Sequence, residues 1–285
     1  MTSRIGSCAC VFRTICMTVA VGILLGGNAM AGVIEVFHAD SLAGPMSELK
    51  KAFEAKNKGV AINLTPGVSK QLEERILKGE TCDIFAPSSQ AVAGDLLSKK
   101  GMAWYVVFSA NEMVVITTKS NPLGIRQISD LAKPGIKFIR ITGEKDLGTN
   151  RTIVFLKKAA AAEGKPELAQ KIVDSAISDP AKPTSVPDTV RAVKEGNANA
   201  GVVYYSAAVA ARNDIDIIRF PASVKVSEEI RNAAGIPATA KNPKEATDFV
   251  RFILSYEGQT ILAQTGQPPV VPAIRAGDVP TELKN

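Results

Sequence analysis

Residues 33–56 read VIEVFHADSLAGPMSELKKAFEAK, a strand-like run that passes through a polar turn into a helix-like pattern. The segment 33–37 is rich in β-branched and aromatic residues, which favour strands. After the turn, Met46, Leu49 and Phe53 recur at helical spacing. A strand followed directly by a helix is the repeating unit of layered α/β proteins, so this stretch indicates the fold class.

The same order continues along the chain. Val- and Ile-rich runs predict further strands at 60–65, 83–87, 112–118, 136–141, 200–205 and 215–220. Apolar residues at helical spacing predict helices at 43–56, 69–79, 89–100, 151–163, 166–176, 188–195, 205–212, 243–254 and 256–264. This alternation predicts mostly parallel sheets with helices on both faces. The 254 residues after position 31 suit two lobes better than one core.

The N-terminus carries a targeting signal. Residues 1–31 contain Arg4 and Arg13 but no acidic residue, then the apolar run 17–25, then Ala29-Met30-Ala31 before Gly32. This is the pattern of a cleavable secretory signal peptide. No cysteine follows a lipobox-like triplet near the cleavage position. The sequence therefore predicts a free, exported periplasmic protein.

Charge and cysteine content exclude several functions. After removal of the signal peptide, the chain has 32 Lys and Arg and 28 Asp and Glu, which gives a net charge of +4. These charges are spread along helical patterns, which argues against nucleic-acid binding. Cys82 is the one cysteine of the mature chain, so no internal disulfide is expected. Its setting at the start of a strand predicts a buried structural thiol.

Three strand-to-helix junctions share one chemical design. Ser41 precedes the helix at 43–56, Ser69 begins the helix at 69–79, and the turn 142–150 precedes the helix at 151–163. Helix N-termini leave backbone N–H groups unpaired and carry the positive end of the helix dipole. Each junction therefore has the features of an anion site, although a serine there can also be an ordinary helix cap.

His38, Asp40 and Ser41 also invite comparison with a serine hydrolase. They are near neighbours at a strand end, where successive side chains point to opposite faces. A catalytic histidine has to lie between its serine and its acid, and these positions do not allow it. We therefore expect no enzyme, with His38 a half-exposed loop residue and a secreted hydrolase using Ser41 only a remote alternative.

The order of motifs resembles a known family. The run 36–89, VFHADSLAGPMSELKKAFEAKNKGVAINLTPGVSKQLEERILKGETCDIFAPSS, is followed by GVVYYSAAVA at 201–210 and YEGQTILAQTG at 256–266. Together they resemble the periplasmic molybdate-binding proteins of ABC importers, including the molybdate/tungstate branch. The resemblance covers almost the whole mature chain.

This resemblance implies a two-lobed periplasmic-binding-protein fold of type II, with each lobe a sheet flanked by helices. The lobes would be 32–112 plus 222–285 and 113–221, joined by hinge strands near 110–118 and 216–224. It implies no cofactor. The partners it implies are a small oxyanion and a membrane permease, with no nucleic acid, and the protein would be a monomer.

The family also implies ligand-binding positions. Ser41 and Ser69 match two serines that hold the oxyanion from the first lobe, and Tyr204 matches a tyrosine that donates from the second. Val186 and Thr149 match backbone N–H donors. No residue would bind the metal atom directly, because hydrogen bonds would hold the oxyanion.

Three positions depart from the family pattern. Asp40 stands where a small uncharged residue is usual, and we expect its carboxylate to point away from the ligand. Lys70 is uncommon after the second serine, and we expect it to be solvated. Val186 replaces a glutamate found in part of the tungstate branch, which favours a tetrahedral ligand held by hydrogen bonds.

The predicted function is therefore capture of molybdate, and of tungstate, between two lobes for an ABC-type importer. Donors without acceptors would select fully ionised oxyanions, because a proton-bearing ligand needs an acceptor. A receptor for sulfate or a small organic acid on the same fold is the main alternative.

Overall fold

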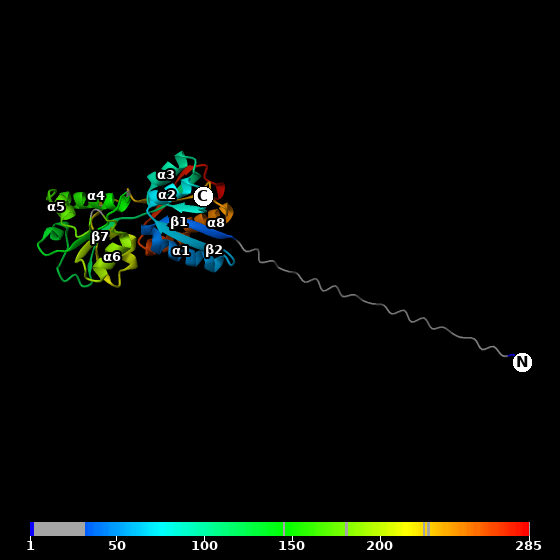
Figure 1. Cartoon of the computed structure of the whole chain (residues 1–285), viewed down its shortest axis with the longest axis horizontal. Helices are drawn as coiled ribbons and strands as arrows, with labels where there is room; N and C mark the ends of the chain where they lie inside the picture. The colour runs from blue at the N-terminus through cyan, green and yellow to red at the C-terminus, as the bar shows by residue number, and fades with distance from the viewer. Residues whose placement is uncertain (3–31, 145, 180–181, 225, 227–228, 285) are drawn as a thin grey trace.

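The computed structural model describes residues 1–2 and 32–284, apart from 145, 180–181, 225 and 227–228. Nearly all of the predicted signal peptide, residues 3–31, thus lies outside the described residues. The described chain forms two α/β lobes side by side (Figure 1). This confirms the predicted fold class.

Six strands of the described chain form the first sheet: β1 (Val33–Ala39), β2 (Ala61–Gly67), β3 (Ile84–Ala86), β4 (Met102–Ala110), β9 (Arg231–Pro237) and β10 (Pro269–Gly277). Their order is β10-β4-β9-β3-β1-β2. β1 pairs in parallel with β2 and β3, with Val33 opposite Ala61 and Val36 opposite Ile84. The remaining pairs, β3–β9, β9–β4 and β4–β10, are antiparallel.

The second sheet has the order β6-β7-β5-β8. Its strands are β5 (Met113–Thr118), β6 (Phe138–Arg140), β7 (Ala200–Tyr204) and β8 (Ile215–Ile218). β6 and β7 are parallel, whereas β5 is antiparallel to both β7 and β8. The expectation of mostly parallel sheets is therefore wrong. The strands on either side of the two crossings, β4 and β5 at the first and β8 and β9 at the second, pair antiparallel with their neighbours.

Helices cover both faces of each sheet. On the first sheet, α1 (Ala43–Lys56), α8 (Pro243–Leu254) and α9 (Tyr256–Gln264) lie on one face, and α2 (Ser69–Leu77) and α3 (Gln90–Ser98) on the other. On the second, α4 (Leu147–Ala162) and α5 (Leu168–Asp174) oppose α6 (Val186–Lys194) and α7 (Tyr205–Ala210). The short 3-10 helices are η1 (Asp40–Leu42), η2 (Ile128–Ala132), η3 (Ala222–Val224) and η4 (Thr281–Leu283).

Alternation along the strands divides each core in two. Val36 packs with α1 and α8, whereas the next residue, Phe37, packs with α2 and α3. In the second sheet, Val115 and Val114 divide in the same way between the two faces. Cys82 belongs to one of these cores, and burial raises the pKa of its thiol, so the prediction of a buried structural thiol is confirmed.

The chain crosses between the sheets after β4 and again after β8. A buried network of neutral groups lies at the first crossing. The Asn111 amide donates to Ser206 Oγ at 2.9 Å, and Ser206 Oγ donates to the carbonyl of Ser41 at 2.7 Å. Gln267 Nε2 reaches the same carbonyl at 3.3 Å. The predicted lobe boundaries at 112/113 and 221/222 remain predictions, which the sheet membership supports.

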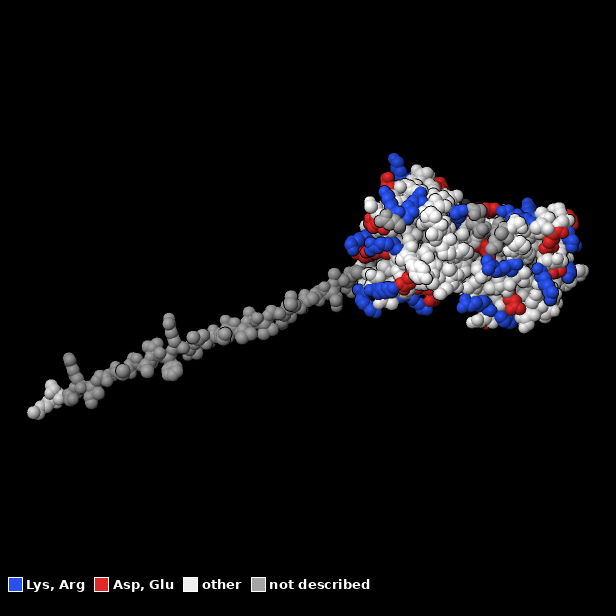
Figure 2. All heavy atoms as spheres, turned by 180° about the vertical axis from the view of Figure 1, so that it is seen from behind, with Lys and Arg blue, Asp and Glu red and all other residues white. Residues whose placement is uncertain are grey.

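Charged side chains of both signs are interspersed over the face seen in Figure 2. This distribution agrees with the spread of charge along the sequence. Among the described residues, no helix is both long enough and apolar enough to cross a bilayer.

Candidate functional site

A small cavity lies between the two lobes where several strands end. It is lined from the first lobe by residues that follow β1, β2 and β3, and from the second by residues at the starts of α4 and α6 and the end of β7. Its volume is about 20 Å³. Sites for drug-sized ligands begin at about 300 Å³, so this cavity suits a compact ligand. The lining residues are Ala39, Asp40, Ser41, Gly67, Val68, Ser69, Ser88, Asp146, Leu147, Val186 and Tyr204.

Four hydroxyl groups line this cavity, and three of them already accept a hydrogen bond. Ser69 Oγ accepts from the backbone N–H of Ser88 at 3.2 Å. Ser88 Oγ and the Tyr204 hydroxyl accept from Arg151 Nη1 at 3.1 and 3.0 Å. Each hydroxyl carries one hydrogen, which these contacts leave available for donation.

Ser41 supplies the fourth hydroxyl. The residue is 4% exposed, and its Oγ has no hydrogen-bond partner among the described residues. Buried hydroxyls are nearly always paired, so an unpaired one at a cavity wall points to a ligand. The arrangement of the four hydroxyls is therefore that of a donor set.

Backbone amides add to this donor set. Ser69, Leu147 and Val186 are the first residues of α2, α4 and α6, and all three line the cavity. Amides in the first turn of a helix have no acceptor within the helix. Three helix N-termini thus face one small space, which favours a negatively charged ligand.

Arg151 connects the two lobes beside the cavity. Its side chain starts from α4, is 5% exposed, and reaches Ser88 of the first lobe through two contacts, Nη1 to Oγ and Nη2 to the carbonyl oxygen at 2.6 Å. Nη2 also donates to the carbonyl of Glu229 at 2.9 Å. The guanidinium therefore fixes Ser88 and Tyr204 and brings a positive charge close to the donors.

Two carboxyl groups also line the cavity. Burial, and secondarily the charge of Asp146, raises the pKa of Asp40. Burial likewise raises the pKa of Asp146, although the N–H of Gly148, which donates to Asp146 Oδ1 at 2.7 Å, and Arg151 oppose that rise. Both acids line the cavity together with the hydroxyls, so the lining is not made of donor residues alone. Asp40 also lines a larger groove beside the cavity, and the expected direction of its carboxylate remains a prediction.

The structure brings together four of the five predicted ligand residues: Ser41, Ser69, Val186 and Tyr204. Thr149 is not among the described lining residues. The reason is that α4, capped by Asp146, begins at Leu147 and not near 151. Thr149 therefore lies in the first turn of the helix, where its N–H donates to the Asp146 carbonyl. Leu147 takes its place at the cavity.

His38 is not the half-exposed residue that the sequence predicted. It is 1% exposed within β1, burial lowers its pKa, and its Nδ1 lies 2.9 Å from the carbonyl oxygen of Ala39. The remote hydrolase alternative gains nothing from this placement. In the part of the chain that the structure describes, no group of three or more His, Cys, Asp or Glu side chains is placed to hold a metal ion.

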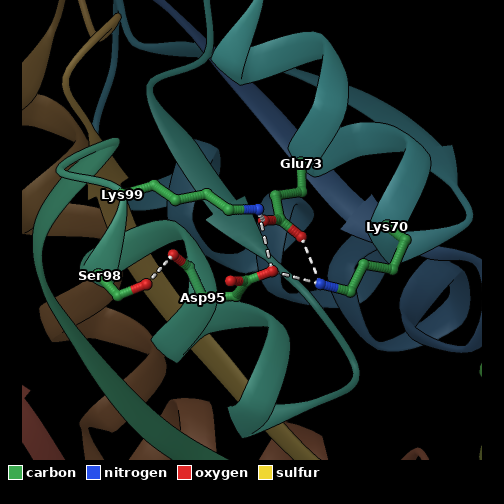
Figure 3. Close-up of polar contacts among 5 residues, drawn as sticks. All are labelled: Lys70, Glu73, Asp95, Ser98 and Lys99. Carbon is green, nitrogen blue, oxygen red and sulfur yellow. Dashed lines mark hydrogen bonds and ion pairs between the residues drawn. The ribbon is translucent and has the colours of Figure 1, made fainter.

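Lys70, next to Ser69, turns away from the cavity into an ion-pair cluster that joins α2 to α3 (Figure 3). Its Nζ contacts Glu73 at 3.0 Å and Asp95 at 2.6 Å, and Lys99 contacts the same two carboxylates. Lys70 and Lys99 hold the pKa of Asp95 down to about 2. Lys70 therefore keeps partial access to water, as expected, but is also held in ion pairs, and the cluster anchors the helix that begins with Ser69.

We expect Glu73→Gln to lower the free energy of unfolding by about 1 to 2 kcal/mol, because the Glu73 side chain is 2% exposed between two lysines that keep access to water. Urea unfolding at neutral pH measures this. The matched control is Glu48→Gln, which breaks the exposed pair with Lys51 and should change stability by less than about 0.5 kcal/mol. Equal effects of the two variants would show that the cluster does not stabilise α2.

A groove of about 540 Å³ adjoins the cavity between α1 and the pair α6 and α7. Asp40, Ser41 and Val186 line both spaces. Besides Asp40, the charged residues on the groove are Arg191, Lys194, Glu195 and Asp214, with Arg191 paired to Asp188 and Lys194 paired to Asp214 at 2.7 Å. The groove therefore adjoins the part of the cavity that Asp40 lines.

Several known proteins resemble this chain in sequence or in fold. The molybdate-binding protein ModA of Mycobacterium bovis is 28% identical, over 85% of this chain and 86% of its own. The molybdate/tungstate-binding protein WtpA of Pyrococcus abyssi is 24% identical, over 99% and 96%. The periplasmic molybdate-binding protein of Azotobacter vinelandii superposes with a TM-score of 0.68 at 18% identity, over 84% of this chain and 99% of its own, which shows a shared fold.

The family model for bacterial extracellular solute-binding proteins matches residues 34–267. This span runs from β1 almost to β10 and includes every residue that lines the cavity. The chain belongs to the bacterial extracellular solute-binding protein family.

Proposed function

We propose that the protein captures molybdate or tungstate in the interlobe cavity and delivers it to an ABC-type importer in the membrane. The observation that carries this proposal is the set of four hydroxyls, three of which already accept one hydrogen bond while the fourth is unpartnered among the described residues. A dianion stripped of water needs several donors, and hydrogen bonds to a charged group are about twice as strong as neutral ones.

The names of the relatives support the choice of ligand, since both sequence relatives are described as binding molybdate. We infer a periplasmic location after removal of a signal peptide at 1–31, as for the Azotobacter protein. We also infer that the protein acts as a monomer without a cofactor or enzymatic activity.

Closure of the lobes would be the signal for the importer. Ser41, Ser69 and Ser88 belong to the first lobe, whereas Leu147 and Tyr204 belong to the second. An anion bound by both sets favours the closed arrangement over any open one, because only the closed arrangement brings all the donors together. A permease that recognises the closed surface would then receive loaded protein.

A thermal-shift panel of molybdate, tungstate, sulfate, phosphate and citrate tests the proposal. At about 100 times Kd, ligand adds about 2.7 kcal/mol, which corresponds to a rise in Tm of about 5 to 10 °C for a protein of this size. Ser41→Ala and Ser69→Ala should each weaken binding by about 10- to 100-fold, because each removes one hydrogen bond to a charged ligand.

The matched control is Ser98→Ala, an exposed serine that bonds the Asp95 carbonyl, and it should leave the shift unchanged. A shift with sulfate or citrate but not with molybdate or tungstate would replace the proposed ligand by another anion. No shift with any of the anions would refute an oxyanion site.

A further inference from the structure

Asp40 and Asp146 present a charge problem for any dianion in this cavity. Among the described residues, the Asp40 carboxylate has no hydrogen-bond donor, and the Asp146 carboxylate has one, the N–H of Gly148 on Oδ1. Both residues line the space that is also lined by Ser41 with its unpartnered hydroxyl, and the charge of Asp146 acts on Asp40. With both acids ionised, a bound dianion would make four negative charges around one small space.

The positive charge available there is smaller. Among the cations that the structure describes, Arg151 alone contacts the lining residues through hydrogen bonds, and its donors are used by Ser88, Tyr204 and Glu229. On the groove side of Asp40, Arg191 and Lys194 are paired with acids, and Glu195 adds a further negative charge. Tyr204 is the remaining titratable group among the described lining residues, and burial raises its pKa, so it stays neutral.

Two like charges about 4 Å apart repel by about 4 kcal/mol at the effective dielectric constant of a protein surface. One proton on the acid pair removes such a repulsion and turns an acceptor into an O–H donor aimed at the ligand. The donor set and the acid pair are therefore compatible only if a proton enters with the anion.

We propose that Asp40 and Asp146 determine ligand specificity by binding one proton together with the oxyanion. This inference rests on the proposed oxyanion site. When a fully ionised oxyanion binds, a carboxylate oxygen of the pair takes up one proton from solvent. No bond of the anion breaks. A monoanion such as dihydrogen phosphate brings its own proton, so it can donate a hydrogen bond to the ionised pair and reach the same total charge without taking a proton from solvent.

Isothermal titration calorimetry of the purified protein with sodium molybdate, sodium sulfate and sodium phosphate, between about pH 6 and about pH 8, tests this. These values lie above the ordinary carboxyl pKa of about 4. Because the anion raises the pKa of the pair, affinity for molybdate or sulfate should fall about tenfold per pH unit above the pKa of the free pair and be flat below it. Measurements in two buffers of different ionisation enthalpy should show uptake of about one proton per anion, and phosphate should show less uptake.

Asp40→Asn and Asp146→Asn separate the two acids, and asparagine at 146 keeps the oxygen that caps α4. Each should reduce proton uptake and make the affinity for molybdate or sulfate less dependent on pH. Asp214→Asn, on the groove but not among the described cavity residues, is the matched control and should keep the pH dependence. Tight binding of molybdate or sulfate with no pH dependence and no proton uptake would overturn the acid pair alone, whereas no anion binding at any pH would overturn the oxyanion site as well.

Discussion

Replacing Arg151 with methionine should weaken anion binding by about 100-fold and lower the free energy of unfolding by about 3 kcal/mol. The stability loss follows because four acceptors lose their donor together: three buried ones, the carbonyl and hydroxyl of Ser88 and the Tyr204 hydroxyl, and the partly buried Glu229 carbonyl. The binding loss follows because the nearby positive charge disappears and two donor hydroxyls lose the contacts that orient them. Calorimetry and urea unfolding measure the two effects separately.

Arg191→Met is the matched control, since Arg191 lies on the adjoining groove but its side chain is 62% exposed and pairs with Asp188. It should change stability by less than about 1 kcal/mol and leave affinity nearly unchanged. Arg151→Lys adds a further test. Lysine keeps the charge but cannot match the planar fork of arginine, so it should recover part of the affinity and little of the stability. Full affinity in Arg151→Met would show that the guanidinium has no part in anion binding.

Asp83→Ala should be the most destabilising single change outside the cavity, at about 4 kcal/mol. Asp83 is fully buried and its carboxylate accepts from three backbone N–H groups, those of Glu35, Lys241 and Asn242, at 2.7 to 2.9 Å. The Asn242 side chain adds a fourth contact at 3.2 Å. Truncation leaves these donors unpaired between β1, β3 and the start of α8.

Denaturant unfolding of the first lobe checks this. Asp83→Asn should cost less, because its oxygen can keep the contacts with Lys241 and Asn242 while its NH₂ group faces the N–H of Glu35. Asp174→Ala, an exposed acid that accepts from Gln170 on α5, serves as control and should lie within about 0.5 kcal/mol of the parent. Similar losses for the buried and exposed acids would contradict the role assigned to Asp83.

The helices were more predictable than the strands, for physical reasons. The bounds of α1, α8 and α9 follow directly from apolar spacing at 3.6 residues. The sequence did not indicate β4, β9 and β10. β4 is apolar on both faces and shows no alternation, β9 is rich in Ala and Gly, and β10 contains prolines that usually disfavour strands.

The cavity shows a similar division between local and long-range signals. Ser41, Ser69 and Tyr204 were accessible because each stands at a recognisable junction of strand and helix. Arg151 was missed because a charged residue early in a helix resembles an ordinary solvated side chain. The proximity of Asp40 to Asp146 was missed because Asp146 lies more than a hundred residues further along the chain. No local pattern reports such a pairing.

The bond from Ser206 to Ser41 has a mechanical consequence. The hydroxyl of Ser206, on α7, holds the carbonyl of the same residue whose own hydroxyl faces the cavity. Movement of the second lobe away from the first therefore pulls on the peptide that carries a ligand donor. Separation of the lobes and displacement of the Ser41 hydroxyl from the cavity are therefore coupled through one hydrogen bond.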